Sequence, residues 1–579
     1  MKQVDGLHNV EIAWVFYEIA DLLEIKEDNP FKPRAYRKAG RTIAKWDQPL
    51  SALKEDEIRA IPGVGAALAA KITELLKTGK CEYHQKLREE VPLGLLEVLA
   101  IPGLGAKTAR TLYRKLGITT IDELEAAAKA RKIRTLPGMG NKTEFAILHG
   151  IDMLRTGSGA APVGVATAVG RNLAEFLAAL PEVTQVSLAG STRRMKEMIG
   201  DIDLVVASEK PVEVTGLFVK HPSVKEVSAH GENQVKAITW LGIQVDLLVV
   251  GPQEYWAALH HFTGSKEHNQ RLQELAGERG LKIYEYGVFP EGQDESLPVN
   301  SEEDLYLALG LPYIPPELRE DEGEIEAALE GTLPDLVSVE DIRGDLHLHS
   351  KWSDGVATIE EIVAAARQRG YEYIAITDHS KSLAIAGGLK EERLMEQHRY
   401  IDELNRGLED FRVLRGIEVD ILSDGRLDYG DELLSGMDVV IASIHSGFRQ
   451  SREEMTKRML SALKNPHVNI LAHPTGRMLG RRDAYEVDLE KVFEAAAKYD
   501  KVLEINASPD RLDLNAENVR RAAKDYGLKI AVNTDAHHIS KLEDMYFGIG
   551  TARRGWLEKK DVINTFTLEE LGRIFGKRG

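Results

Sequence analysis

The sequence has a single cysteine, Cys81, and only 6% of its 579 residues are aromatic. One thiol cannot form an internal disulfide or a thiolate metal cage, so disulfide scaffolds and cysteine-based zinc fingers are excluded. No apolar run approaches the roughly 20 residues that cross a bilayer, and the N-terminal residues lack the layout of a signal peptide. We therefore expect a cytoplasmic protein that has no membrane partner.

The chain is too long for one hydrophobic core. At roughly 100–200 residues per domain, its length predicts about three to five domains. Apolar residues make up 43% of the chain and charged residues 29%, which is typical of globular proteins.

The formal net charge of −18 is unevenly distributed. Residues 1–150 contain 24 basic and 20 acidic side chains, whereas residues 301–350 contain 2 basic and 14 acidic ones. Most of the acidity therefore lies in one stretch, and the N-terminal part is compatible with contact to phosphate.

A short pattern, an apolar residue followed by Pro-Gly-x-Gly, occurs three times in the first 150 residues, at 61–65, 101–105 and 136–140. Each copy precedes a predicted helix; helices are expected at 10–23, 66–76, 107–116 and 142–154. Glycine lets the backbone approach a phosphate, and a helix N-terminus offers free N–H groups. A plain helix–helix turn is the alternative reading of each copy.

The repeats resemble the helix-hairpin-helix motif of DNA repair proteins. The resemblance implies contact with DNA backbone that does not depend on sequence, and a monovalent cation at the turns. The residues expected to bind DNA are Gly63, Gly65, Gly103, Gly105, Lys107, Gly138 and Gly140.

Residues 34–39 (RAYRKA), followed by IPGVG and Lys71, resemble the lyase domain of DNA polymerase beta. That resemblance implies that Lys71 forms a Schiff base with a 5′-deoxyribose phosphate. The other reading makes Lys71 a solvated helix lysine, and Ala67 replaces the family lysine that grips the 5′-phosphate.

A second motif, SLAGSTRRMKEMIGDIDLVVA, occupies residues 187–207. Alternation along a strand puts Asp201 and Asp203 on one face. Asp246 lies within an apolar predicted strand, 243–250, where an unpaired carboxylate is costly. Three such acids favour a shared site for Mg²⁺.

The Gly-Ser and Asp-x-Asp elements resemble the nucleotidyltransferase superfamily, with the spacing of family X DNA polymerases. The resemblance implies that the three aspartates bind two ions, Mg²⁺ or Mn²⁺, with Asp246 under the primer 3′-hydroxyl. Residues 261–269 (HFTGSKEHN) resemble an element near the nucleotide sugar and base. The implied nucleotide contacts are Gly190, Ser191, Arg194, Gly200, Phe262, Gly264 and Asn269.

The last 235 residues contain short apolar strands, predicted at 373–376, 439–442, 470–472, 502–505 and 530–532, that alternate with helices such as 359–369. Histidines and carboxylates lie where these strands end, as in the active sites of βα barrels. The candidate metal ligands are His347, His349, Asp354, His379, Glu418, His445, His473, Asp535 and His537. Imidazole and carboxylate without thiolate suit Zn²⁺, Mn²⁺ or Fe²⁺.

These nine positions resemble the polymerase-and-histidinol-phosphatase (PHP) domain, which implies up to three ions. One is expected at His347, His349, Glu418 and Asp535. The second is expected at Glu418, His445 and His473, and the third at Asp354, His379 and His537.

Together the motifs predict a multidomain α+β and α/β protein: a helical N-terminal region, a nucleotidyltransferase palm, a small thumb and a distorted barrel of the (βα)7 type. The expected domains are a lyase-like helical domain (1–85), a second helix-hairpin-helix domain (86–156), the palm (157–255), the thumb (256–316), an acidic linker (317–341) and the PHP domain (342–579).

The resemblance implies a bacterial or archaeal family X DNA polymerase that fills short gaps in repair with dNTPs. Its partner would be gapped or nicked DNA, and we expect a monomer. The PHP domain would be a 3′–5′ exonuclease, with 3′-phosphodiesterase or abasic-site activity as a further implication. Two alternatives stay open: a nuclease whose polymerase half only binds DNA, and a hydrolase of small phosphate esters.

Overall fold

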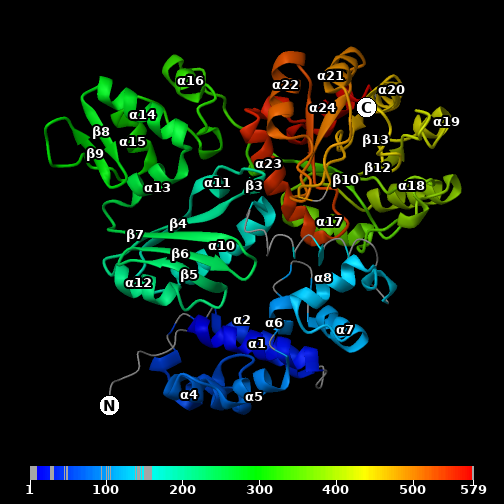
Figure 1. Ribbon diagram of the computed structural model, residues 1–579. Coiled ribbons are helices and arrows are strands. Elements are labelled where there is room, and N and C mark those ends of the chain that lie inside the picture. The colour runs from blue at the N-terminus through cyan, green and yellow to red at the C-terminus, as the bar shows by residue number, and fades with distance from the viewer. Residues whose placement is uncertain are drawn as a thin grey trace. The chain divides into compact units, whose positions relative to one another are not determined.

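The computed structural model describes residues 9–26, 31–44, 46, 48, 50–92, 94–99, 101, 104, 106–136, 139, 144, 147–148, 151 and 160–576 without 481. The chain divides into two compact units. The first comprises residues 1–160, 170–187 and 200–252, and the second comprises residues 161–169, 188–199 and 253–579. Figure 1 labels the elements of both.

The first unit begins with helices held by two hydrophobic cores. Phe16 and Leu23 belong to one core with Ile72, and Leu112 belongs to the other with Leu124. The elements are α1 (Asn9–Lys26), α2 (Phe31–Ala44), η1 (Leu50–Ala52), α3 (Glu55–Ala60), α4 (Ala66–Thr78), α5 (Glu82–Glu90), α6 (Gly94–Leu99), α7 (Ala106–Leu116), α8 (Ile121–Lys129) and η2 (Ile133–Thr135). The helices predicted at 10–23, 66–76 and 107–116 are confirmed; the one at 142–154 lies mostly outside the described residues.

The first Pro-Gly-x-Gly turn joins α3 to α4. Gly63 has a φ of +89°, a left-handed conformation that L side chains rarely adopt. Gly65 is the N-cap of α4 and offers no side-chain cap, so the first N–H groups of this helix point out of the turn uncapped. Gly103, Gly105, Gly138 and Gly140 of the other two copies lie outside the described residues.

The first unit also contains a five-stranded sheet, of which only Leu188 belongs to the second unit. Its strand order is β2-β4-β7-β6-β5. The elements are β2 (Gln185–Leu188), β4 (Asp201–Ala207), α12 (Pro211–Phe218), β5 (Val224–His230), β6 (Gln234–Thr239) and β7 (Gln244–Val250). The strand predicted at 243–250 is confirmed as β7, and Asp201 and Asp203 lie on one strand, β4, as expected. β5 was not predicted, because this edge strand is almost fully exposed and carries no buried apolar alternation.

The second unit includes two short segments, 161–169 and 188–199, and the residues predicted to form a thumb. Strand β1 (Ala161–Pro162) pairs antiparallel with β3 (Met198–Ile199), and helix α10 (Val163–Ala178) runs from the second unit into the first. The other elements are α11 (Gly190–Arg193), α13 (Tyr255–Thr263), α14 (Lys266–Glu278), the hairpin β8 (Leu281–Tyr284) and β9 (Gly287–Pro290), and α15 (Glu302–Ala308).

Residues 317–341 are packed, which differs from the acidic linker that the composition predicts. They contain most of η3 (Pro316–Leu318), helix α16 (Glu324–Glu330) and η4 (Val339–Asp341). Ile325 lies in the thumb core, and the buried carboxylate of Glu324 lies 2.6 Å from Nδ1 of His268. Glu317 pairs with Arg553 at 2.7 Å. Glu324 and Glu317 have a buried and a basic partner, whereas Glu330 and Glu340 are exposed, so the number of acidic residues did not distinguish a packed segment from a linker.

The C-terminal part forms a nearly closed barrel of seven parallel strands in sequence order. The strands are β10 (Gly344–Leu348), β11 (Tyr373–Ile376), β12 (Arg412–Asp420), β13 (Val439–Ser443), β14 (Ile470–Leu471), β15 (Val502–Asn506) and β16 (Ile530–Asn533). The first strand meets the last, because Leu348 forms a parallel bridge with Ala536 and the His349 N–H donates to the Ala536 carbonyl at 3.0 Å. The predicted barrel is confirmed.

Helices surround these strands (Figure 1). They are α17 (Ile359–Gln368), α18 (Glu391–Asn405), α19 (Asp431–Leu434), α20 (Arg452–Leu463), α21 (Leu489–Lys498), α22 (Ala516–Tyr526), α23 (Met545–Arg554) and α24 (Leu568–Ile574), with η5 (Ala384–Ala386), η6 (Ile539–Asp544), η7 (Lys559–Asp561) and η8 (Ile563–Thr565). Strands β10 and β12 were not among the predicted strands. Asp345 and His347 interrupt the apolar pattern of β10, and Arg412, Arg415 and Gly416 interrupt that of β12.

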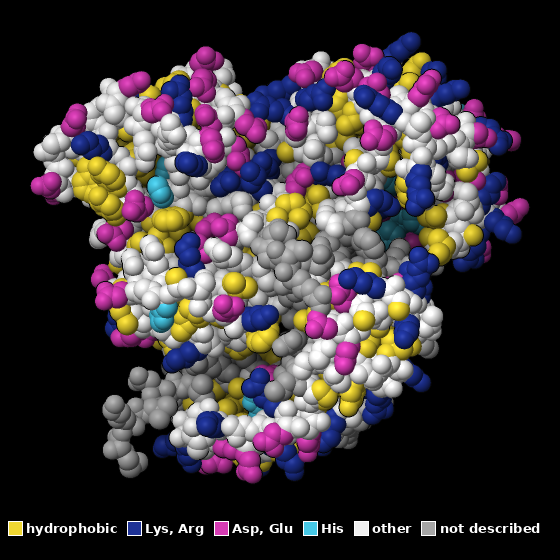
Figure 2. All heavy atoms as spheres, in the orientation of Figure 1, with side chains coloured by type: hydrophobic (Ala, Val, Ile, Leu, Met, Phe, Trp, Pro, Cys, Tyr) yellow, Lys and Arg dark blue, Asp and Glu magenta, His cyan; other side chains and the backbone are white. Residues whose placement is uncertain are grey.

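Among the described helices, none combines the length and the apolar character that a bilayer crossing requires. Acidic and basic side chains are interspersed on the face of the molecule shown in Figure 2.

Candidate metal centres

The barrel strands carry the nine predicted ligands to one end of the barrel. His347 lies within β10, His379 follows β11, and Glu418 lies in β12. His445 and His473 follow β13 and β14, and Asp535 and His537 follow β16; His349 and Asp354 follow β10. Parallel strands end together, so residues far apart in the sequence meet there.

Glu418 lies at the centre of this group and is 1% exposed. Its Oε2 lies 2.7 Å from Nδ1 of His379 and 3.5 Å from Nε2 of both His347 and His349. Its Oε1 lies 3.1 Å from Nε2 of His473 and 3.3 Å from Nε2 of His445. The two oxygens therefore face two different sets of imidazoles, which is the geometry of a carboxylate placed between two ions.

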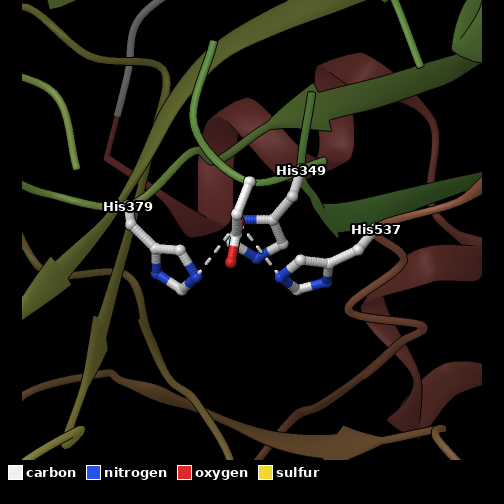
Figure 3. Close-up of side chains that lie close together, drawn as sticks. His349, His379 and His537 are labelled. Atoms are coloured by element: carbon white, nitrogen blue, oxygen red, sulfur yellow. Dashed lines mark ion pairs between the residues drawn. The ribbon is translucent and has the colours of Figure 1, made fainter. Parts of the chain in front are cut away.

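A second cluster contains His349, Asp354, His379 and His537. One ligand atom from each lies within 4.8 Å of the others. Oδ1 of Asp354 lies 3.3 Å from Nε2 of His537 and 3.6 Å from Nε2 of His379. The three labelled imidazoles converge in Figure 3.

Asp535 completes the set on the side of His347 and His349. Its Oδ1 lies 3.0 Å from Nε2 of His349 and 3.6 Å from Nε2 of His347. The structure thus brings all nine residues together, with His349 shared between two clusters.

The charges in this buried site depend on each other. Burial alone would raise the pKa of Glu418, but His445, His379 and His347 hold it well below its usual value. Burial would lower the pKa of His347, but Glu504, Asp535 and Glu418 raise it well above its usual value. Burial and two neighbouring histidines lower the pKa of His349 to about 3. The site therefore holds carboxylates ionised among imidazoles.

Several ligand atoms make no hydrogen bond within the described part of the chain. They include Nε2 of His347, both ring nitrogens of His349 and Oε2 of Glu418. Buried polar atoms are ordinarily satisfied, and an unsatisfied one requires an explanation. Divalent ions held by Glu418 and by one ring nitrogen of each imidazole would explain most of these atoms, so the donor set fits a polynuclear site of nitrogen and oxygen ligands.

Two carboxylates that were not among the predicted site residues contact ligand histidines at Nδ1, while Nε2 of each ring faces Glu418. Glu504 in β15 is fully buried and accepts from Nδ1 of His347 at 2.8 Å. Asp420 in β12 lies 2.6 Å from Nδ1 of His445. Such contacts fix the tautomer and the ring orientation of a ligand histidine. The alternation Glu418-x-Asp420 was visible in the sequence, and Glu504 lies within the apolar strand predicted at 502–505, the same signal that singled out Asp246.

The first unit contains a separate carboxylate cluster in its sheet. Asp201, Asp203 and Asp246 each offer a carboxylate oxygen within 4.8 Å of the others. The reason is register: β4 and β7 are parallel, and Asp203 lies directly opposite Asp246. Three acids at this separation repel one another unless cations lie among them.

Asp246 has two side-chain partners. Nζ of Lys236 lies 2.7 Å from its Oδ2, and the Gln244 amide donates to its Oδ1 at 2.7 Å. The carboxylate in turn raises the pKa of Lys236, with smaller contributions from Asp201 and Asp203. Lys236 was not among the predicted site residues; it lies ten residues from Asp246 and meets it only through strand pairing.

The predicted triphosphate contacts divide between the two units. Gly190, Ser191 and Arg194 belong to the second, and Gly200, just before β4, belongs to the first. Gly190 begins α11 with a φ of +57°, and the buried Oγ of Ser191 makes no hydrogen bond within the described residues.

Arg194 is engaged inside the second unit. It is 8% exposed, and its Nε donates to Glu320 at 3.0 Å while its Nη1 donates to the Thr263 carbonyl at 2.9 Å. Glu320 also accepts from Arg554 of α23 at 2.9 Å. The predicted nucleotide contact therefore already has an anionic partner in this structure.

The residues expected near the sugar and base shape the turn between α13 and α14. The Asn269 amide donates to the His261 carbonyl at 2.6 Å, and its Oδ1 has no hydrogen-bond partner within the described residues. A Cβ on Gly264 would lie 2.4 Å from that Oδ1, so a larger residue here would displace the Asn269 side chain. Phe262 is half-buried beside the His261 ring.

Lys71 projects from α4 beside an aromatic ring. Its Nζ lies 4.8 Å from the centroid of Tyr83 and 3.5 Å from the Ala67 carbonyl. Lys107 is exposed near the start of α7.

Family models match four parts of the chain: "Helix-hairpin-helix domain" at residues 7–81, "SAM-like Helix-hairpin-helix tandem" at 95–149, "DNA polymerase beta thumb" at 258–320 and "PHP domain" at 345–508.

Curated relatives span the whole chain or part of it. The DNA polymerase/3′-5′ exonuclease PolX of Bacillus subtilis (strain 168) is 41% identical over 567 residues, which cover 98% of this chain and 99% of that protein. A probable phosphatase of Thermoanaerobacter sp. (strain X514) is 32% identical over 203 residues, 33% of this chain and 78% of that protein. A probable phosphatase of Shewanella sp. (strain ANA-3) is 31% identical over 206 residues, 33% of this chain and 75% of that protein.

Proposed function

The chain belongs to the PolX family of DNA polymerase/3′–5′ exonucleases, and on that premise we propose that it fills short gaps in damaged DNA and trims 3′ ends in two separate sites. The polymerase site lies in the sheet of the first unit and the exonuclease site in the barrel. The observation that carries the proposal is that each site gathers its own set of ionisable ligands from strands far apart in the sequence.

In the palm, Asp201, Asp203 and Asp246 would hold two ions, Mg²⁺ or Mn²⁺. Their convergence across β4 and β7 supports this role. When bound in either site, divalent ions stabilise the charge that develops on phosphoryl oxygens and activate the attacking oxygen. Asp246, with both oxygens held by neighbours, would face the primer 3′-hydroxyl.

Nucleotide binding would involve Gly190, Ser191, Arg194 and Gly200 on the triphosphate and Phe262, Gly264 and Asn269 beside the sugar and base. Within the described residues the Ser191 hydroxyl and the Asn269 carbonyl have no hydrogen-bond partner, which supports free hydrogen-bonding capacity at these positions. Arg194 would exchange its contact with Glu320 for a phosphate.

In the barrel, the nine ligands would hold up to three ions of Mn²⁺, Zn²⁺ or Fe²⁺. Glu418 would lie between two of them, and Glu504 and Asp420 would keep His347 and His445 oriented with Nε2 toward the site. The substrate would be the terminal phosphodiester of a 3′ end. By the same chemistry, removal of 3′ blocking groups and cleavage at abasic sites are further proposed activities.

The helix-hairpin-helix turns would hold the duplexes that flank a gap, through phosphate and without reading sequence. Gly63 and Gly65 support this role through the exposed, uncapped start of α4, where a monovalent cation would also find backbone carbonyls. We propose the same phosphate contact for the other two copies of the turn, through Gly103, Gly105, Lys107, Gly138 and Gly140.

Lyase activity at Lys71 is a separate proposal. Trapping with borohydride on a 5′-deoxyribose phosphate end tests it, with Lys77→Ala as the control on the same helix. An adduct that forms in the Lys77→Ala protein and disappears in Lys71→Ala is expected; no adduct in the unaltered protein would remove the activity.

The experiment that tests the two-site division follows primer extension and 3′-end digestion on one gapped duplex. Asp203→Asn should abolish extension and leave digestion intact, and Glu418→Gln should do the reverse. Loss of both activities in either variant would contradict the division.

A second candidate function is a phosphoesterase or nuclease whose palm serves only as a DNA-binding scaffold. The engagement of Arg194 by Glu320 favours it, since a triphosphate must displace that contact. If the protein digests 3′ ends but does not extend primers, this second candidate is the correct one.

A further inference from the structure

Lys236 contacts the carboxylate cluster of the palm from a neighbouring strand. β6 and β7 are antiparallel, and Lys236 lies directly opposite Asp246 in their register. The distance from Nζ to Oδ2 of Asp246 is 2.7 Å, while Gln244 holds Oδ1. Both oxygens of Asp246 are thereby fixed by side chains of the same sheet.

An exposed cross-strand ion pair usually contributes little to stability, and the side chain of Lys236 is 55% exposed. Its surroundings set this pair apart. Asp246 lies within 4.8 Å of Asp201 and Asp203, so the cluster has three negative charges that repel one another. A cation anchored on Asp246 reduces that repulsion and restricts rotation of the carboxylate.

We propose that Lys236 is a positioning residue for the polymerase reaction, which keeps Asp246 in the orientation that attack by the primer 3′-hydroxyl requires. The proposal rests on the proposed polymerase function of this cluster. In this role Lys236 contacts neither the nucleotide nor the primer, and it acts through Asp246. Residues that orient a metal ligand typically change metal affinity or activity by about 10- to 100-fold when they are replaced.

The test uses the full-length protein with three substitutions: Lys236→Met, Lys236→Arg and Lys225→Met. Lys225 is an exposed lysine of β5 in the same sheet, whose Nζ lies 5.6 Å from the Trp240 ring, and it serves as the matched control. Single-nucleotide extension on a gapped duplex gives kcat and the KM for dNTP. Digestion of 3′ ends by the same preparation reports on the rest of the molecule.

A second measurement follows the metal itself. Electron paramagnetic resonance counts Mn²⁺ bound in the palm as the difference between each protein and its Asp201→Asn counterpart. Lys236→Met should lower kcat at least about tenfold with little change in KM. Its palm should bind Mn²⁺ no more weakly than before, since a positive charge near the ion is lost. Lys236→Arg should recover most of the rate, and Lys225→Met should match the unaltered protein.

The proposal is overturned if Lys236→Met extends primers at the unaltered rate, or if Lys236→Arg is as slow as Lys236→Met. Weaker Mn²⁺ binding in the palm would overturn it too, because Lys236 would then support ion binding and not the orientation for attack. An equal loss of digestion would also overturn it, because it shows a damaged fold. If the unaltered protein extends no primer, the proposed polymerase function itself fails, which is a distinct result.

Discussion

Glu504 offers the sharpest test of how the barrel prepares its ligands. Its Oε1 accepts from Nδ1 of His347 at 2.8 Å and from Nδ2 of Asn533 at 2.9 Å, and its Oε2 accepts from the backbone N–H of His473 at 2.9 Å. A carboxylate satisfies all three buried donors at once. The isosteric variant Glu504→Gln has only one acceptor oxygen.

If the remaining oxygen stays at the Oε1 position, the new amide N–H₂ faces the N–H of His473, and a buried donor loses its partner. Such a loss costs about 1–3 kcal/mol of folding stability. The neutral oxygen also holds the ring of His347 less firmly, and we expect Mn²⁺ affinity of the barrel and the rate of 3′ digestion to fall about 10- to 100-fold.

The assay combines Mn²⁺ titration of the metal-free protein with 3′ digestion and primer extension on the same preparation. Glu494→Gln, an exposed residue of α21, is the control and should change neither. Extension should survive in Glu504→Gln because the palm is untouched. Unchanged Mn²⁺ affinity and unchanged digestion in Glu504→Gln would refute the reasoning that Glu504 prepares His347 for a metal.

Three further predictions concern other parts of the chain. Glu320→Gln removes the anion that engages Arg194, so the KM for dNTP should fall about fivefold, the equivalent of about 1 kcal/mol. The exposed control Glu326→Gln should leave this KM unchanged. An unchanged KM in Glu320→Gln as well would argue that Arg194 does not contact the triphosphate. In metal-free protein, burial would lower the pKa of His445, but Glu418 and Asp420 raise it to about 10. Below the ordinary histidine pKa near 6.5 the charged His445 contributes its full stabilisation, and this contribution is lost as the pH rises toward 10. The melting temperature should therefore drop less over this range in His445→Gln than in the unaltered protein. Equal drops in the two proteins would contradict the assignment. Gly63→Val forces a β-branched residue to a φ of +89° in the first Pro-Gly-x-Gly turn and should weaken binding of gapped DNA, measured by fluorescence anisotropy. Gly79→Val meets a similar left-handed strain at the other end of α4 and should not weaken binding. Equal binding by both variants would remove the turn from the DNA interface.

Much of the fold follows from local sequence patterns. Five of the seven barrel strands were predictable because buried parallel strands read as short apolar runs between amphipathic helices, as at Tyr373–Ile376 and Val439–Ser443. The exceptions are instructive. β12 contains Arg412, Arg415 and Gly416 among its apolar residues, and β5 lies at a sheet edge where almost nothing is buried. Neither shows the periodicity that marks a strand.

The acidic stretch 317–341 shows the limit of composition. Its charge density predicts a solvated linker, yet Glu324 is buried against His268 and Glu317 pairs with Arg553. Those partners lie 56 and 236 residues away in the sequence. Composition counts charges and cannot reveal the long-range pairings that neutralise them.

What the sequence by itself determined are the chemical groups: Asp201 and Asp203 two residues apart on one strand, His347 and His349 two residues apart at the end of another, and the Pro-Gly-x-Gly turns. Spacing along a single element fixes such pairs because backbone geometry is local. Only the tertiary structure decided which groups meet across elements: Lys236 against Asp246, Glu504 behind His347, and the two oxygens of Glu418 toward different histidines. Those contacts depend on strand register and barrel closure, which hydrophobic burial over the whole chain sets and no short segment encodes.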